Sequence, residues 1–433
     1  EIIRASAQGV LTVTKVAKKQ RTRKPAAPFT TSTLQQEASR KLRFSARKTM
    51  MVAQSLYQGI DIGDESVGLI TYMRTDSVNL ANEAVSDLRT FIRERYGDDN
   101  LPNQPPSYQT KAINAQEAHE AVRPTSVARA PDAVKSYLTT DQASLYDLIW
   151  KRTVASQMIP AVFDTVALNL AAGKTPHEEI IFRANGSVLV KPGYMAVYQE
   201  GSDENEQQDR DRLLPPMNGG DHLTLKEIVS DQHFTEPPPR YSEATLVKVL
   251  EEYGIGRPST YASIISTLQN RKYVEMENRR FIPTDVGKVV NAFLTKYFSQ
   301  YVDYEFTAHM EGSLDAISRG EKEYISILEE FWQPFHERVE HINETVTREE
   351  AAQARNLGTD PVSGRLVIVR MGKYGPFVQI GTKDDEEKPS FASLKPGQKM
   401  DEILLDEALD LFQLPRDLGE TPEGEAVSAN IGR

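Results

Sequence analysis

One strand-like stretch near the start of the chain constrains the fold more than any other feature, because it has no neighbour with which to pair. Residues 9–15 (GVLTVTK) alternate between apolar and polar side chains, the pattern of a half-buried β-strand. The next alternating stretches are residues 165–171, 180–183, 187–191 and 223–229, interrupted by a charged loop at 199–212. We pair the first strand with these later ones, which predicts a multidomain α+β fold.

The long stretch between those strands has helical patterns. Ser32 is placed to cap a helix carrying Leu34 and Leu42, and Ser45 to cap a second helix that ends at Gly59. Further helices are predicted over residues 84–96 and about 140–158. The polar segment at residues 61–66 (DIGDES) is interpreted as a surface loop.

Residues 68–80 (GLITYMRTDSVNL) contain the most reactive combination in the chain. Residues 69–71 predict a short strand, and residues 75–79 a turn and helix cap, so Tyr72 and Arg74 lie at a strand end and on one face. A phenol has a pKa of about 10 and needs a neighbouring cation to act as a nucleophile. A guanidinium could hold phosphate oxygens for that attack. The alternative is a packed Tyr72 and a solvated Arg74.

A second block, residues 242–282, has the order helix, turn, helix, hairpin, as in a winged helix. Ser242 caps the first helix, residues 254–256 break it, Pro258 starts the next, and the hairpin turns at residues 277–278. Arg257, Ser259 and Thr260 stand at a helix N-terminus, where they suit either a phosphate or plain capping. Arg271, in the last helical turn, either contacts DNA or complements the helix dipole.

The remainder predicts helices over residues 284–298 and 321–347, then a hairpin over residues 365–381. Tyr374 and Phe377 of this hairpin either stack on bases of single-stranded DNA or stabilise their own small β domain.

Composition restricts the class of protein. The 433 residues are 39% hydrophobic and 26% charged, without cysteine, which excludes disulfides and thiolate metal sites in this chain. No apolar run is long enough to span a membrane. The net charge of −11 conceals a basic first part, because residues 1–50 hold twelve Lys or Arg against two Glu. We interpret the basic run at residues 15–24 as a solvated loop rather than a DNA contact.

The string ITYMRTDS around Tyr72 resembles the active-site signature of type IA DNA topoisomerases, the bacterial topoisomerase I group in particular. Four further stretches resemble that family in the same order, and the hairpin at 365–381 resembles its C-terminal repeats. The four stretches are residues 27–36 (APFTTSTLQQ), 116–125 (QEAHEAVRPT), 243–274 (EATLVKVLEEYGIGRPSTYASIISTLQNRKYV) and 306–315 (FTAHMEGSLD).

The resemblance implies roles for individual residues. Tyr72 would become joined to a 5′ phosphate of DNA, Arg74 would assist it, and His119 would orient the scissile phosphate or support the pair. From the residues alone, His119 is a structural hydrogen-bonding group, and Arg123 either contacts DNA or pairs with Glu117 or Glu120. The resemblance adds DNA contacts by Arg123, Arg257, Ser259, Thr260 and Arg271.

The resemblance also implies a division into four domains. These are a β-rich arch or hinge (residues 1–26 and 160–232), a catalytic tyrosine or gate domain (27–159), a helical winged-helix-like DNA-binding domain (233–348) and a C-terminal repeat domain (349–433). The arch would act as the hinge that swings the inserted gate domain away.

Religation in this family requires Mg²⁺ held by an Asp-x-Asp-x-Glu cluster in an N-terminal Toprim domain, and this sequence has no such cluster. We therefore expect an ATP-independent isomerase fragment, cytoplasmic and monomeric, that binds single-stranded and negatively supercoiled DNA but is inactive alone. Two alternatives stay open: a non-catalytic single-stranded-DNA-binding module, and a relative of topoisomerase III or reverse gyrase.

Overall fold

The computed structural model describes residues 9–63, 65–109, 119–173, 177–201, 214–414, 416–420 and 426–429. The chain divides into two compact units. The first comprises Glu1–Glu252 and Arg257–Ala262, and the second comprises Tyr253–Gly256 and Ser263–Arg433. Helices and antiparallel sheets occur together, which confirms the α+β prediction. None of the described helices combines the length and apolar character that crossing a membrane requires.

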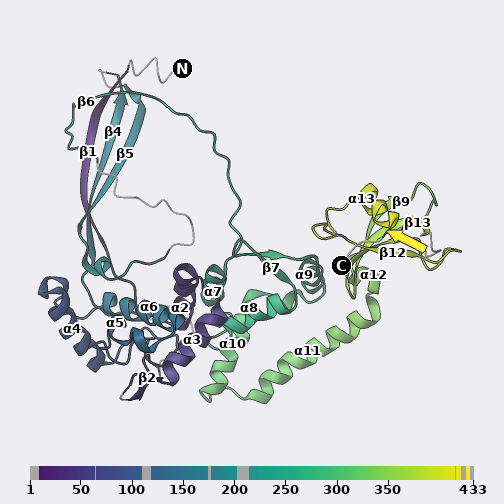
Figure 1. Ribbon diagram of the computed structural model, residues 1–433, viewed down its shortest axis with the longest axis horizontal. Helices are drawn as coiled ribbons and strands as arrows, with labels where there is room; N and C mark the ends of the chain where they lie inside the picture. The colour runs from purple at the N-terminus through teal and green to yellow at the C-terminus, as the bar shows by residue number, and fades with distance from the viewer. Residues whose placement is uncertain are drawn as a thin grey trace. The chain divides into compact units, whose positions relative to one another are not determined.

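The first unit contains a four-stranded antiparallel sheet in the order β5–β4–β1–β6 (Figure 1). Its strands are β1 (Val10–Arg23), β4 (Ala161–Ala172), β5 (His177–Lys191) and β6 (His222–Thr224). β1 pairs with β4 along nearly its whole length, from Leu11 opposite Ala172 to Arg23 opposite Ala161. The predicted pairing of the first strand with strands far along the chain is confirmed.

Two predictions for this sheet are wrong. The supposed loop at residues 15–24 is the second half of β1, because β4 supplies a backbone partner as far as Arg23. Residues 180–183 and 187–191 are not separate strands but parts of β5. Gly186 interrupts the sequence pattern there, yet it lies within the ladder opposite Val166.

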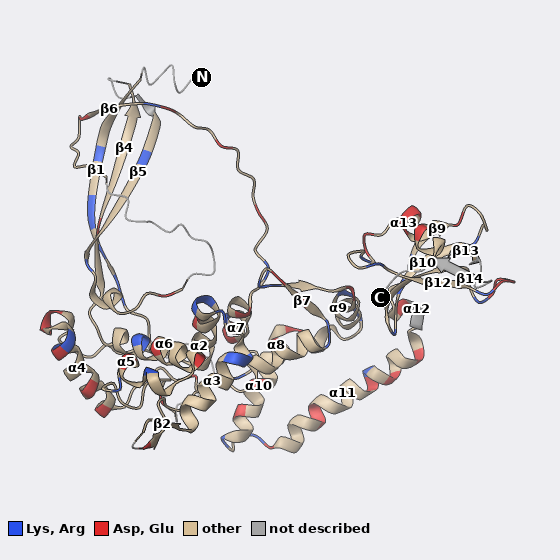
Figure 2. Ribbon diagram, in the orientation of Figure 1, with Lys and Arg blue, Asp and Glu red and all other residues tan. Residues whose placement is uncertain are grey.

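The two faces of the sheet differ in chemistry. On one face Leu11, Val13, Leu168 and Leu170 are buried, and Leu223 packs against them. The opposite face carries exposed basic residues of β1, and Figure 2 colours the Lys and Arg positions of this strand blue. These exposed residues are Lys15, Lys19, Arg21 and Arg23. The period of two in a strand therefore separates an apolar face from a basic one.

Residues 27–159 form a helical module between β1 and β4. Its helices are α2 (Thr31–Glu37), α3 (Ala46–Gln58), α4 (Asn82–Tyr96), α5 (Pro131–Val134) and α6 (Thr140–Ser156), with a π-helix at Ala38–Leu42 and 3₁₀ turns at Asp98–Asn100 and Lys135–Tyr137. Phe29, Leu34, Leu69, Tyr146 and Ile149 are fully buried in its core. A 3₁₀ turn at Gly193–Ala196 follows β5 and packs on this module.

Side chains cap the first two helices of this module, one as predicted and one not. Ser45 caps α3 as predicted, since its hydroxyl accepts a hydrogen bond from the Lys48 amide. The cap of α2 is Thr30 rather than Ser32, because Thr30 and Thr33 form a reciprocal capping box while Ser32 is buried inside the helix. The predicted loop at residues 61–66 contains a minimal ladder, β2 (Ile60–Asp61) with β3 (Ser66–Val67).

Helix α7 (Glu243–Glu252) also belongs to the first unit. The side chains of Ser242 and Thr245 exchange hydrogen bonds with each other's amides, so the predicted cap is confirmed. The Glu243 Oε2 accepts a hydrogen bond from the Ala46 amide (2.6 Å), which ties α7 to the start of α3. The predicted break follows, where Gly254 adopts a positive φ.

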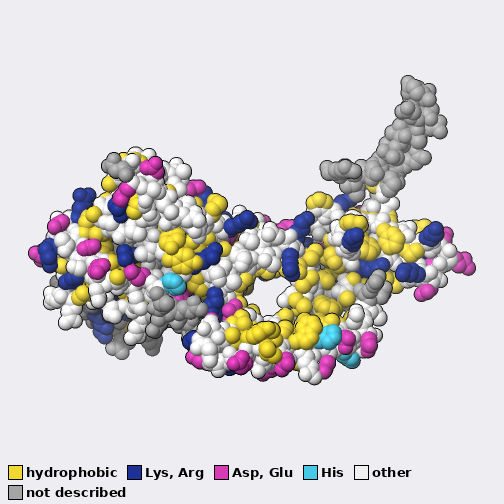
Figure 3. Space-filling view, turned by 90° about the horizontal axis from the view of Figure 1, so that it is seen from below, with side chains coloured by type: hydrophobic (Ala, Val, Ile, Leu, Met, Phe, Trp, Pro, Cys, Tyr) yellow, Lys and Arg dark blue, Asp and Glu magenta, His cyan; other side chains and the backbone are white. Residues whose placement is uncertain are grey.

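Helix α8 (Tyr261–Asn270) begins in the first unit and enters the second at Ser263. The second unit then continues into a hairpin of β7 (Val274–Glu277) and β8 (Arg280–Pro283). The hairpin turns at Asn278 and Arg279, both at positive φ, one residue beyond the predicted position. Three helices follow: α9 (Asp285–Tyr297), α10 (Tyr304–Ser318) and α11 (Tyr324–Thr345), with a 3₁₀ turn at Ser299–Tyr301 between α9 and α10. Helices α9 and α11 were predicted from the sequence, and α10 was not. Figure 3 shows apolar side chains at the surface along α11, where Trp332 is exposed.

A small four-stranded sheet lies near the end of the described chain, in the order β12–β11–β10–β9, and β13–β14 form a separate two-stranded sheet after it. After α12 (Arg348–Ala351), its strands are β9 (Arg355–Thr359), β10 (Leu366–Gly372), β11 (Gly375–Ile380) and β12 (Ser390–Ser393), followed by α13 (Leu405–Asp410), a 3₁₀ turn at Leu411–Gln413, β13 (Arg416–Glu420) and β14 (Ala426–Ala429). The predicted hairpin is β10–β11. Tyr374 at its tip is 94% exposed, whereas Val367, Val369 and Val378 are buried in the local core.

Candidate active site around Tyr72

Residues 68–77 connect the β2–β3 ladder to the segment before α4, with a bend at Met73, and we call them the tyrosine strip. The Thr71 amide donates a hydrogen bond to the Arg123 carbonyl (2.9 Å), and Ile70 forms an isolated antiparallel bridge with Pro124. The predicted strand at residues 69–71 is therefore only a bridge. The Thr125 amide donates to the Leu69 carbonyl (3.0 Å), so the hydrogen bonds of this bridge are made by the residues on either side of Pro124.

Thr31, in the first turn of α2, anchors the strip from its other side. Its hydroxyl donates to the Met73 carbonyl (2.6 Å) and accepts from the Thr75 amide (2.8 Å). The side chains of Met73 and Thr75 are buried. Of the residues on either side of Met73, Tyr72 is half-buried and Arg74 is exposed.

Aromatic rings lie on two sides of Tyr72. The Tyr57 ring, from the last turn of α3, lies 5.4 Å from it between centroids at an interplanar angle of 66°. The His119 ring lies 5.6 Å away at 40°. Tyr72 is half-buried, and its hydroxyl forms no hydrogen bond with any residue in the described ranges. Arg74 is exposed and has no ion-pair partner in that same part of the chain.

The start of α4 differs from the prediction, and the difference accounts for Arg123. Neither Ser77 nor Asn79 caps the helix; its N-cap is Ala81, whose amide donates to Glu120 Oε2 (3.2 Å). Glu120 also accepts two hydrogen bonds from the Arg123 guanidinium, at 2.6 and 3.2 Å. Burial opposes ionisation of Glu120, but these bonds outweigh it and lower the pKa of the carboxyl.

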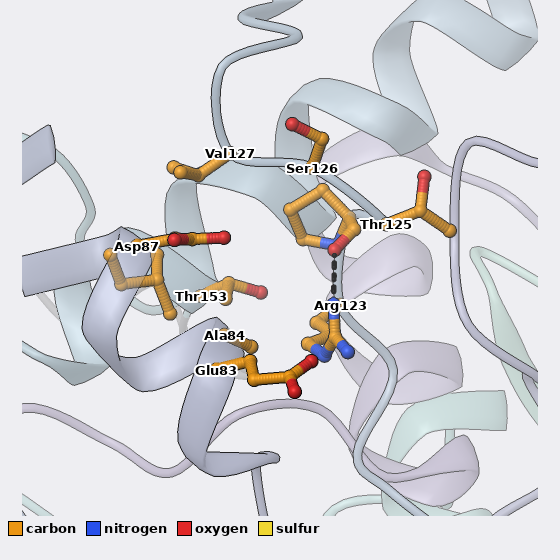
Figure 4. Close-up of a pocket in the computed structure, with 10 residues that line it drawn as sticks. Glu83, Ala84, Asp87, Arg123, Thr125, Ser126, Val127 and Thr153 are labelled. Atoms are coloured by element: carbon orange, nitrogen blue, oxygen red, sulfur yellow. Dashed lines mark hydrogen bonds between the residues drawn. The ribbon is translucent and has the colours of Figure 1, made fainter.

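The Arg123 side chain also borders a pocket of about 100 Å³ between α4 and α6. Figure 4 shows the Glu83 carboxylate directed toward the guanidinium, and the dashed line marks the bond from Arg123 to the Pro124 carbonyl (3.0 Å). In this conformation Arg123 pairs with Glu120, one of the two partners that the sequence suggested. The other candidate partner, Glu117, lies outside the described residues.

The Arg257 group belongs to the first unit, like Tyr72. Residues 258–260 form a turn rather than the predicted helix start at Pro258, and α8 begins at Tyr261. The Thr260 hydroxyl accepts from the Arg257 amide (2.8 Å) and donates to its carbonyl (3.2 Å), while Ser259 is exposed. Arg271 is exposed just beyond α8, in the second unit.

The predictions overlooked Tyr57 and Thr31. Thr31 lies within the family-like stretch at residues 27–36, so that stretch was the available signal. For Tyr57 the only sequence signal was its position two residues before Gly59 at a helix end, because its contact with Tyr72 depends on tertiary folding.

A comparison with protein families matches residues 1–329 to the DNA topoisomerase model, and residues 360–423 to the topoisomerase C-terminal repeat. This chain belongs to the type IA DNA topoisomerase family. DNA topoisomerase 1 of Xylella fastidiosa (strain Temecula1) is 57% identical over all of this chain and 53% of its own length. DNA topoisomerase 1 of Rickettsia felis is 41% identical over 97% of this chain and 63% of its own.

A solved structure agrees with this assignment. Full-length topoisomerase I of Thermotoga maritima matches with a TM-score of 0.73 at 33% identity, over 94% of this chain and 63% of that one. This topoisomerase chain thus spans about half to two thirds of the length of the relatives that it matches.

Proposed function

We propose that this chain supplies the nucleophile of a type IA topoisomerase, with Tyr72 cutting one DNA strand and holding its 5′ phosphate. The observation that carries the proposal is the half-exposed phenol on an anchored strip, beside the His119 ring and two residues before the exposed Arg74.

The chemistry is a transesterification, in which one phosphate ester bond replaces another. The Tyr72 oxygen attacks phosphorus and loses its proton, a phosphotyrosyl P–O bond forms, and the bond to the 3′ oxygen breaks. The 3′ oxygen takes a proton as it leaves. Arg74 stabilises the charge that develops on the phosphate oxygens, and the reverse step rejoins the strand. His119 orients the phosphate or the Tyr72–Arg74 pair. Passage of a second strand between the two steps would relax negative supercoils.

Further residues of both units would contact the DNA. Arg257, Ser259, Thr260 and Arg271 offer cations, hydroxyls and amides to phosphates. Arg123 would contact a phosphate only if its guanidinium released the Glu120 carboxylate. Tyr374 is exposed enough to stack on a base of single-stranded DNA, as the C-terminal repeat suggests.

The family uses Mg²⁺, and the described residues of this chain contain no cluster of three acidic or histidine side chains that would fit it. We assign the metal to a Toprim domain of the complete protein. We expect the complete protein to be a cytoplasmic monomer, and this chain alone not to relax supercoils.

The decisive experiment traps the covalent intermediate. The complete protein is mixed with a 3′-labelled single-stranded oligonucleotide and quenched with detergent, so that label on the protein reports a 5′-phosphotyrosyl link. We expect the adduct with the wild type and with Tyr137→Phe, and none with Tyr72→Phe. An adduct that persists in Tyr72→Phe would refute the proposal. DNA binding without any adduct from the wild type would instead favour the non-catalytic module.

A further inference from the structure

Tyr57 is the aromatic residue whose ring lies nearest that of Tyr72, the proposed nucleophile. None of the sequence motifs discussed above gives Tyr57 a role. It stands in the last turn of α3, and 40% of its surface is exposed. Its ring meets the Tyr72 ring at 66°, the edge-to-face geometry that aromatic pairs favour.

The backbone holds Tyr57 and the tyrosine strip in a close, fixed relation. The Leu69 amide donates to the Leu56 carbonyl (2.8 Å), one residue before Tyr57. A Cβ at Gly68 would lie only 2.6 Å from the Tyr57 carbonyl oxygen, so the two backbones approach as closely as glycine permits. Leu56 itself is fully buried, which makes this end of α3 a rigid support.

A half-exposed tyrosine outside such a support can change rotamer, and that motion carries its hydroxyl through several ångströms. Attack on phosphorus requires the reacting atoms to be about 3–3.5 Å apart and in line, so rotamer freedom lowers the rate. The Tyr57 ring blocks one side of Tyr72, and the His119 ring limits another.

We propose that Tyr57 is a positioning residue for strand cleavage: its ring edge holds the Tyr72 ring in the rotamer from which the phenol attacks. This inference rests on the proposed function of Tyr72. It requires the aromatic ring of Tyr57 and not its hydroxyl, for which no described residue provides a hydrogen bond.

The test measures single-turnover cleavage of a labelled oligonucleotide by the complete protein, together with its affinity for that oligonucleotide. Tyr57→Leu should cleave about tenfold more slowly at saturating DNA, the loss expected for an aromatic pair, with its Kd within about twofold of the wild type. Tyr57→Phe keeps the ring and should cleave at close to the wild-type rate. Tyr137→Leu, an exposed tyrosine of the same unit, is the matched control.

Several results would overturn the inference. Wild-type cleavage by Tyr57→Leu would show that the ring is dispensable, and equal losses in Tyr57→Phe and Tyr57→Leu would point to the hydroxyl. A weaker Kd that accounts for the whole loss would make Tyr57 a DNA contact instead. Tyr57→Met, which is closer in length, repeats the test if Tyr57→Leu lowers the melting temperature. Persistence of the adduct in Tyr72→Phe would sink the proposed function itself, so the two failures are distinguishable.

Discussion

Two places in the first unit set an arginine near a tyrosine, and they use the pair differently. On the tyrosine strip, Tyr72 is half-exposed and Arg74 reaches solvent. Tyr198, which follows β5, and Arg152 of α6 are each only 4% exposed. The Arg152 guanidinium lies 5.3 Å from the Tyr198 ring and donates to the Ala27 carbonyl (2.6 Å). The residue types are the same, so their surroundings must decide between chemistry and support.

The buried pair is held by a carboxylate. The Tyr198 hydroxyl donates to Glu37, which is 2% exposed and also accepts from the Gly201 amide (3.0 Å). Burial raises the pKa of Tyr198; Arg152 opposes this rise and Glu37 adds to it. A phenol that is buried, bonded and hard to ionise cannot serve as a nucleophile at neutral pH. The contrast with Tyr72 shows that an exposed hydroxyl without a fixed partner, rather than an adjacent arginine, distinguishes the candidate nucleophile.

The largest expected effect is on stability, from Glu37→Ala. Removing this carboxylate leaves Tyr198, Arg40 and the Gly201 amide without their buried acceptor, so the first unit should lose about 3–5 kcal/mol. The measurement is urea unfolding followed by Trp150 fluorescence in a Trp332→Phe background.

Its matched control is Glu65→Ala, because Glu65 is 57% exposed and pairs with Arg129 at the surface. That change should cost less than about 1 kcal/mol. If Glu37→Ala were as stable as the control, the buried cluster of Glu37, Tyr198 and Arg152 would not stabilise the first unit.

Exchange of arginine for lysine separates the two regions next. Arg152→Lys loses the fork that bonds Ala27 and Glu200 (2.9 Å) and should cost about 2–3 kcal/mol by urea unfolding. Arg74→Lys should change stability by less than about 0.5 kcal/mol. In the complete protein, however, it should slow cleavage, because a point charge cannot replace the bidentate fork. Equal stability losses would contradict the comparison.

The phenol hydroxyls should differ in the same direction. Tyr198→Phe removes a buried bond to a carboxylate and should cost about 1–2 kcal/mol, measured as above. Tyr72→Phe should cost less than about 0.5 kcal/mol, while abolishing the covalent adduct. A large stability loss in Tyr72→Phe would mean that its hydroxyl has a structural partner.

Local signals in the sequence predicted some of this organisation. Ser45 could be recognised as a cap because it stands alone before an amphipathic run. Thr30 could not, since residues 30–33 are all hydroxyl residues and the choice depends on tertiary bonds from Thr31 to the strip. The basic half of β1 was missed because its strand character comes from β4, more than a hundred residues later.

The candidate site shows the same division. The spacing of Tyr72 and Arg74 predicts a common side only for an extended backbone, and their common side stays a prediction because the chain bends at Met73 between them. His119 was predicted to lie near the tyrosine only from the family resemblance, because no local sequence pattern indicates that contact. Tyr57 has no such pattern, and only the closed contact between α3 and Gly68 puts its ring against Tyr72.

The smallest expected effect is a pH dependence near the buried pair. Tyr108 donates to the Ser156 carbonyl (2.7 Å), and burial raises its pKa from 10.0 to about 12, with Arg152 opposing and Tyr194 adding to the rise. The folded chain thus keeps this proton to a higher pH than the unfolded chain does. The resulting stability is fully present below pH 10 and is lost as the pH rises toward 12.

Tyr108→Phe removes this titration, so the variant should lose about 1 kcal/mol less than the wild type between pH 9 and pH 11, measured by urea unfolding at each pH. Comparing slopes rather than absolute values cancels the hydrogen bond that the variant lacks at every pH. Tyr137→Phe, which removes a half-exposed phenol, controls for the loss of one tyrosine. Identical slopes for Tyr108→Phe and the wild type would show that Tyr108 ionises as freely when folded as when unfolded, and would exclude it from the supporting cluster around Arg152.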